Sequence, residues 1–342
     1  MSAQAIQPAT STRWTALCRW SRRSRALLAV AGSILSILMG AAPAVAAPGR
    51  WVAVGPFGAP VMALAVTPEA PQVLYAGTAN GLFKSAGASS TGLRFEALPL
   101  DRFITAIVVI PSDPPAVLAA TASGIFRSAD GGLTWQKDGG QQVFGVEFQT
   151  LVLDPRDSSI VYAGAGLTGD GGTDSGLFKS TDAGLTFEAA DRGIEHTVVS
   201  SIAVDPFDSR TVYAASPQPS NLVSTPQPTG VFKSTNGGAT WQVKNHGLRL
   251  PAAKDERFGL QTGVIQVAVD PETAGTLYAV VGYSGELYRS RDGAESWQLL
   301  PTGFAAATLV VGRHGVLYLG GALPGQPPEV WKSLDGGRHW RR

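Results

Sequence analysis

Uninterrupted apolar runs recur along this chain, and each predicts a buried strand. The clearest, each followed directly by Asp-Pro, are residues 149–153, 198–204 and 264–269. A continuous apolar run of this length, bounded by a turn signal, is typical of a strand covered on both faces. Asp-Pro favours the start of a turn. We therefore expect each run to be the inner strand of a sheet.

The runs belong to a larger unit that repeats. After the turn come a strand resembling Val-Tyr-Ala-Gly, a strand resembling Gly-Leu-Phe-Lys-Ser, and a Gly-rich turn that closes on an aromatic residue. We call five such segments the box turns: 128–135, 180–187, 234–241, 290–297 and 333–340. Their shared positions are Ser128, Asp130, Gly132 and Trp135; Ser180, Asp182, Gly184 and Phe187; Ser234, Asn236, Gly238 and Trp241; Ser290, Asp292 and Trp297; and Ser333, Asp335, Gly337 and Trp340.

An earlier copy of the unit is degenerate. It keeps both middle strands, at 74–77 and 81–85, but its turn has no acidic residue between positions 87 and 95. Self-similarity at such a period is the signature of a repeat architecture.

The box turns match the pattern S-x-D-x-G-x-T-W with at most two departures in each turn, which resembles the Asp-box (BNR) repeat. That repeat occurs in sialidases, family 74 xyloglucanases, sortilin-type receptors and photosystem assembly propellers. The resemblance covers residues 51–342. It implies an all-β fold: a single β-propeller of about six four-stranded blades, or seven if the degenerate region contains another unit. Each box would lie between the third and fourth strands of a blade.

The residue types of the box point to a structural role. An Asp or Asn in a tight turn accepts hydrogen bonds from nearby backbone N–H groups, and Ser or Thr does so more weakly. The Gly supplies a positive φ, and the aromatic side chain buries a large surface between blades. We therefore interpret the repeated Asp residues as structural and not as catalytic or metal-binding groups.

The chain ends just after the last aromatic, so the final blade is expected to lack most of its outer strand. Residues 51–54, Trp-Val-Ala-Val, resemble the segment that follows other boxes. We predict that they pair with the last blade and close the ring, which removes an exposed sheet edge.

The first 47 residues are predicted to be a secretory signal, and residues 48–342 the propeller. Five arginines precede an apolar run over 26–40, and a small-residue tract with A-x-A spacing follows at 42–47. An uncleaved membrane anchor and a twin-arginine route are the alternatives. We expect export to the periplasm or the exterior, with no membrane span after cleavage.

Composition narrows the classes of partner. The net charge is +1, and without the five arginines of the signal it becomes −4, so no nucleic-acid footprint is present. The only cysteine, Cys18, lies in the signal, so the mature domain has no disulfide. We expect a monomer without a cofactor or metal.

Length variation falls on one face of the predicted ring, where the connections between strands two and three meet those between blades. Variable loops on a rigid scaffold are a usual place for binding, although surface insertions also cost little and can drift. The candidate ligand-binding residues in these loops are Asp170, Asp174, Asp255, Glu256, Arg257, Phe258 and Tyr283. The first two could coordinate calcium, but loop acids exposed to solvent are the simpler interpretation.

Two functions follow from the resemblance. The first is a non-catalytic exported propeller that binds a protein or a cell-surface glycan through the loop face. The alternative is a glycoside hydrolase, sialidase-like or xyloglucanase-like, which needs two carboxylates at a fixed separation or a tyrosine nucleophile. The sialidase entry motif is absent, and family 74 enzymes pair two propellers where this chain has length for one. We therefore predict a binding propeller in the first place, and the catalytic residues of the alternative stay unknown.

Overall fold

The computed structural model describes residues 55–67, 73–89, 92–138, 146–166, 176–194, 197–217, 229–250, 263–282, 284–323 and 325–342. Within these ranges the chain forms 23 β-strands and no helix. Accordingly, the described residues contain no helix long and apolar enough to cross a membrane.

The strands form six antiparallel sheets, which we number as blades in chain order. Blade 1 contains β1 (Val61–Val66), β2 (Leu74–Thr78), β3 (Gly81–Ser89) and β4 (Gly92–Ala97); blade 2 contains β5 (Ile104–Ile110), β6 (Ala116–Thr121), β7 (Gly124–Ser128) and β8 (Gln136–Asp138); blade 3 contains β9 (Phe148–Leu153), β10 (Val161–Ala165), β11 (Leu177–Ser180) and β12 (Glu188–Ala189). Blade 4 contains β13 (Ser201–Val204), β14 (Val212–Ser216), β15 (Gly230–Ser234) and β16 (Gln242–Val243); blade 5 contains β17 (Val264–Val269), β18 (Leu277–Val281), β19 (Leu287–Ser290) and β20 (Gln298–Leu300); blade 6 contains β21 (Ala305–Val311), β22 (Leu317–Ala322) and β23 (Glu329–Ser333).

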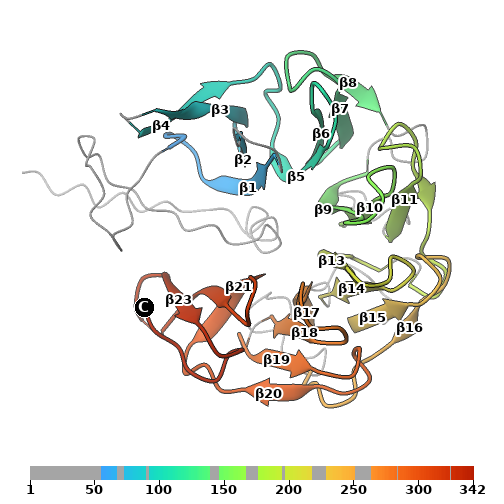
Figure 1. The fold of residues 1–342 in the computed structure, drawn as a ribbon, viewed down its shortest axis with the longest axis vertical. Coiled ribbons are helices and arrows are strands. Elements are labelled where there is room, and N and C mark those ends of the chain that lie inside the picture. The colour runs from blue at the N-terminus through green and yellow to red at the C-terminus, as the bar shows by residue number, and fades with distance from the viewer. Residues whose placement is uncertain are drawn as a thin grey trace, which may run out of the picture.

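The blades are arranged around a ring, as Figure 1 shows. The first strand of each blade lies innermost and packs against the first strand of the next, in the order β1, β5, β9, β13, β17 and β21. The molecule is therefore an all-β, six-bladed β-propeller, as the sequence predicts. Each blade is a simple meander, because each strand pairs with its neighbour in the chain.

The core lies between the blades. Side chains alternate across each sheet, so Ile107 and Val109 of β5 pack in the cluster shared with blade 1. Val108 and Ile110 of the same strand pack in the cluster shared with blade 3. This two-sided burial explains why the inner strands are continuous apolar runs and do not alternate with polar residues.

The predicted inner strands are observed with small differences. The run at 264–269 coincides with β17, and the run at 149–153 gains one residue in β9. The run at 198–204 forms a strand only from Ser201 onward, although Val198 and Val199 are buried. Apolarity reports burial, and in this blade two buried residues precede the sheet.

The last blade contains three strands, and the C-terminus supplies the start of a fourth. The backbone of Arg341 exchanges hydrogen bonds with that of Lys332, and Arg342 Nε lies 2.8 Å from a Glu329 carboxylate oxygen. The outer edge of β23 is therefore partly covered by the chain end. The predicted closing strand at 51–54 lies outside the described residues, as does the predicted signal at 1–47.

Candidate functional site

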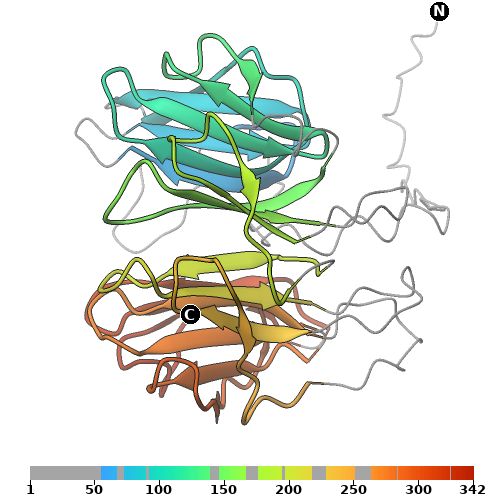
Figure 2. The ribbon, with the colours of Figure 1, turned by 90° about the vertical axis from the view of Figure 1, so that its right-hand side faces the viewer.

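The two ends of the blades carry different connections. The strand one-to-two turns and the box turns lie at one end, which we call the box face. The strand two-to-three connections and the inter-blade connections lie at the other end, which we call the loop face. Figure 2 shows the strands side-on, so that these ends lie on opposite sides of the picture.

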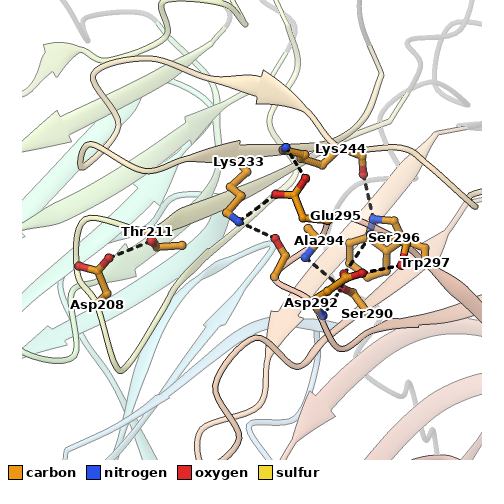
Figure 3. A network of polar contacts seen from close by, with 11 residues as sticks. Asp208, Thr211, Lys233, Lys244, Ser290, Asp292, Ala294, Glu295, Ser296 and Trp297 are labelled. Atoms are coloured by element: carbon orange, nitrogen blue, oxygen red, sulfur yellow. Dashed lines mark hydrogen bonds and ion pairs between the residues drawn. The ribbon is translucent and has the colours of Figure 1, made fainter.

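On the box face, the acidic side chains are used within their own turns. In blade 5, Ser290 Oγ donates to Asp292 Oδ1 at 2.8 Å, and the Ser296 N–H donates to the same oxygen at 2.9 Å. Ser296 Oγ donates to Asp292 Oδ2 at 2.6 Å (Figure 3). These bonds, the Ser296 hydroxyl first, lower the pKa of Asp292 to about 2. Asn236 accepts the same backbone bond in blade 4 without a charge.

A second set of bonds on the box face joins each blade to the next, and we call it the inter-blade latch. A cation on the third strand donates to the backbone carbonyl of the residue after the box Asp or Asn in the following blade. The five pairs are Lys84 to Gly131 (3.2 Å), Arg127 to Ala183 (3.3 Å), Lys179 to Gly237 (2.9 Å), Lys233 to Gly293 (2.8 Å) and Arg289 to Gly336 (3.1 Å). These cations are therefore engaged in the fold.

One latch includes an ionic network. Glu295, which projects from the box turn of blade 5, accepts from Lys244 at 2.6 Å and from Lys233 at 3.3 Å (Figure 3). The lysines, the Lys244 side chain first, lower the pKa of Glu295. All three groups come from the blade 4–blade 5 junction, so the network stabilises that junction and engages both lysines.

On the loop face, Glu147 is the described carboxyl group with a raised pKa. Burial raises it, and a hydrogen bond from Gln149 Nε2 to Glu147 Oε1, at 2.7 Å, opposes the rise. Glu147 directly precedes β9, between Val146 and Phe148, which are 1% and 0% exposed. Strand alternation places the Glu147 side chain on the face of the strand opposite to these two neighbours, where it is partly buried.

Glu147 lies at the base of the first long loop. Its carbonyl oxygen accepts from the Gly166 N–H at 2.7 Å, and Gly166 is the last described residue before that loop. A Cβ on Gly166 would lie 2.6 Å from Gln149 Nε2, so the end of the Gln149 side chain lies across this glycine.

A second carboxyl group lies where the same loop returns to the sheet. A Cβ on Gly176 would lie 2.6 Å from Asp191 Oδ2, so the Asp191 side chain covers this glycine. The loop between Gly166 and Gly176 contains the predicted candidates Asp170 and Asp174, which lie outside the described residues. Glu147 and Asp191 thus lie beside the two ends of the loop that contains Asp170 and Asp174.

A separate polar cluster lies on the loop face of blade 5. Tyr288 donates to Glu286 Oε2 at 2.7 Å, and the Arg249 N–H donates to the Tyr288 hydroxyl at 3.3 Å. Burial, and then the bond to Glu286, raise the pKa of Tyr288 to about 12. A raised pKa keeps the phenol protonated, which disfavours it as a nucleophile.

The remaining predicted candidates, Asp255, Glu256, Arg257, Phe258 and Tyr283, also lie outside the described residues. Glu147 and Gln149 were not among the residues predicted from the sequence. Their signal is a charged and a polar residue alternating with apolar ones at the start of a buried strand, Val-Glu-Phe-Gln. In the part of the chain that is described, no three His, Cys, Asp or Glu side chains group as a metal site would require.

The comparisons with known proteins give relatives among the xyloglucanases. The chain is 26% identical over 162 residues to an oligoxyloglucan-reducing end-specific xyloglucanase of Emericella nidulans, a match of 45% of this chain and 18% of that protein. It is 28% identical over 200 residues to the xyloglucanase Xgh74A of Acetivibrio thermocellus, a match of 53% of this chain and 22% of that protein. The chain thus matches about a fifth of each relative's length. No family model matches the chain.

Solved structures show the same fold. The family 74 xyloglucanase from Xanthomonas campestris aligns with a TM-score of 0.59 and 18% identity, over 81% of this chain and 45% of that one. The family 74 enzyme of Niastella koreensis aligns with a TM-score of 0.54 and 19% identity, over 81% and 49%. YCF48 bound to a D1 peptide aligns with a TM-score of 0.54 and 14% identity, over 79% and 76%.

Proposed function

We propose that this protein is a glycoside hydrolase of the propeller type that cleaves a β-glucan such as xyloglucan at its loop face. The observation that carries the proposal is the sequence similarity to xyloglucanases from two organisms, over about half of the chain. This similarity favours the hydrolase over the non-catalytic binding propeller that the sequence analysis placed first.

Glu147 is the residue we propose as the proton donor. Glycoside hydrolysis needs a carboxylic acid that stays protonated until it protonates the leaving oxygen, and a raised pKa provides this. Burial raises the pKa of Glu147, and Gln149 holds one of its oxygens at 2.7 Å. The other oxygen, Oε2, is then left to face the scissile bond.

The second carboxylate is proposed to come from the adjoining loop. A hydrolase of this type requires a base or nucleophile across the scissile bond from the acid. Asp170 and Asp174 lie in the segment that leaves the sheet beside Glu147, and Asp191 lies where that segment returns. A sialidase-like mechanism has less support, because Tyr288 is held protonated beside Glu286.

A binding propeller is the second candidate, and one observation favours it. The alignment with YCF48, a structure with a bound peptide, covers 79% of this chain and 76% of that one. The alignments with the two family 74 structures cover less than half of those chains. A similar fold is therefore known in a protein that is bound to a peptide. In either case we propose that residues 1–47 direct export to the periplasm or the exterior.

The test is a hydrolysis screen of the full chain against xyloglucan, other β-glucans and sialosides, with the released sugars identified. Release of oligosaccharides from xyloglucan supports the proposal, and release of sialic acid would replace it with a sialidase. No release from any substrate by folded protein would contradict it and favour the binding propeller.

A further inference from the structure

The ring of inter-blade latches is incomplete at one junction, between blade 6 and blade 1. Five junctions carry a cation bonded to the box turn of the next blade, but blade 1 has the degenerate turn that lacks the acidic residue. In blade 6, Lys332 occupies the position that the latch cations hold in the other blades. Its Nζ lies 5.1 Å from the centroid of the Tyr318 ring.

Apolar side chains are exposed on both sides of this junction. On β1, Ala63 and Ala65 pack toward blade 2, so Leu64 and Val66 alternate to the opposite face, and each is 49% exposed. On β21, Leu309 and Val311 pack toward blade 5, so Val310 faces the other way and is 61% exposed. At the corresponding junction between blades 1 and 2, Ile107 and Val109 are each 8% exposed.

Tyr318 adds to this contrast. The tyrosines at the same position of blades 1, 3, 4 and 5 are fully buried at 0–2% exposure, whereas Tyr318 is only partly buried. No packing comparable to that of the other inner strands joins β21 to β1 within the described residues. Figure 1 shows blades 1 and 6 on either side of this break in the ring. We call Leu64, Val66, Val310 and Tyr318 the open seam.

We infer that residues 48–54 of this chain fill the open seam and join blade 6 to blade 1. The segment carries the apolar sequence Trp51-Val-Ala-Val54 and ends directly before Gly55. Gly55 and Gly58 have φ values of +87° and +104°, which suit a reversal of the chain before β1 begins at Val61. Seven extended residues span roughly 23 Å, enough to run back along the six residues of β1.

The seam is favoured over the outer edge of β23, the place that the sequence analysis predicted. On that edge the backbone of Lys332 already pairs with that of Arg341, and Arg342 forms an ion pair with Glu329. Trp340 occupies the aromatic position of the box and packs edge-on against Phe304, at 5.9 Å between ring centroids. A second Trp-initiated strand would compete with this chain end. The seam instead offers uncovered apolar surface, whose burial is favourable.

Disulfide trapping tests the inference directly. The full chain carries Cys18→Ser, which leaves no native cysteine, together with Val52→Cys or Ala53→Cys. The partner cysteine is introduced by Val310→Cys or Leu64→Cys. The matched control pairs the same N-terminal cysteine with Leu133→Cys, a more exposed side chain (67%) on the box face of blade 2.

Under mild oxidation, an intramolecular disulfide is expected at the seam and none at Leu133. Equal trapping at all three positions, or no trapping at the seam in folded protein, would overturn the inference. Disulfides formed only between chains would overturn it in favour of a second copy at the seam. As an independent readout, Trp51→Ala and Val310→Ser should each lower Tm, and the two losses should not add, because both remove the same contact. Unchanged Tm in both variants would also contradict it.

Discussion

The side-chain ammonium of Lys179 in blade 3 donates a hydrogen bond of 2.9 Å to the carbonyl oxygen of Gly237 in blade 4. The hydroxyl of Tyr162 donates to the same oxygen at 3.2 Å, and Lys179 lies 5.3 Å from the Tyr162 ring centroid. One carbonyl of the box turn therefore joins two side chains of the preceding blade. The box turn thus shapes its own blade and fastens it to its neighbour.

Loss of this latch should destabilise the protein. Lys179→Met keeps the length and apolar stem of the side chain but removes the donor, so we expect a loss of about 1–2 kcal/mol in the free energy of unfolding. Chemical denaturation measures it. The matched control is Lys332→Met, which changes the same position in blade 6, where the next blade has no box; it should cost less than about 0.5 kcal/mol. Equal losses of unfolding free energy in the two variants would contradict a stabilising role for the inter-blade latch.

Acid should weaken the box turns. The pKa of Asp292 is lowered from 3.8 to about 2 in the folded protein by the bonds from Ser296 and Ser290. Its contribution to stability is therefore present above about pH 4 and is lost as the pH falls toward about 2. We expect Tm to fall across this interval.

Asp292→Asn provides the control for that pH dependence. A carboxamide keeps the backbone bond, as Asn236 does in blade 4, but it does not titrate. The variant should therefore lose less Tm than the wild type between pH 4 and pH 2. An identical acid profile in the two proteins would show that the box carboxylate is not responsible.

Gly184 in the box turn of blade 3 should not tolerate a side chain, although Ala294 occupies the same position in blade 5 with a φ of +71°. Gly184 has a φ of +82°, and a Cβ there would lie 2.5 Å from Leu118 Cδ1 in the preceding blade. Gly184→Ala is expected to cost about 2–4 kcal/mol, from backbone strain and overpacking together. Gly303, with a φ of +77° and open space around its Cβ position, isolates the strain alone. Gly303→Ala should cost only about 1 kcal/mol of the free energy of unfolding. Similar losses in Gly184→Ala and Gly303→Ala would show that contact with Leu118 does not contribute.

The repeat made the fold predictable, because each copy carries the same order of apolar runs and turns. The inner strand at 264–269 and the six-bladed ring follow from that order. The latch could not be predicted, because Lys179 and Gly237 are 58 residues apart and belong to different copies. A signal was present all the same: a Lys or Arg directly precedes the Ser of each segment that resembles Gly-Leu-Phe-Lys-Ser.

The candidate site was harder to predict than the fold. The predicted carboxylates all come from long loops, which are recognisable in the sequence as insertions between the repeats. Glu147 lies instead directly before a regular strand, and its pKa is raised by burial that only the packed ring creates. The pairing of Glu147 with Gln149 follows from strand alternation, which places residues two apart on the same face.

The most direct test of the proposed function compares xyloglucan hydrolysis by the full chain and by its Glu147→Gln variant, with released reducing ends as the readout. The variant keeps the size of the side chain and an oxygen that Gln149 can bind, so the fold and Tm should be retained. We predict clear release by the wild type and a loss of at least about 100-fold in the variant, because general acid catalysis contributes about 10²–10⁴-fold. No release by folded wild-type protein, or equal release by both proteins, would contradict the account.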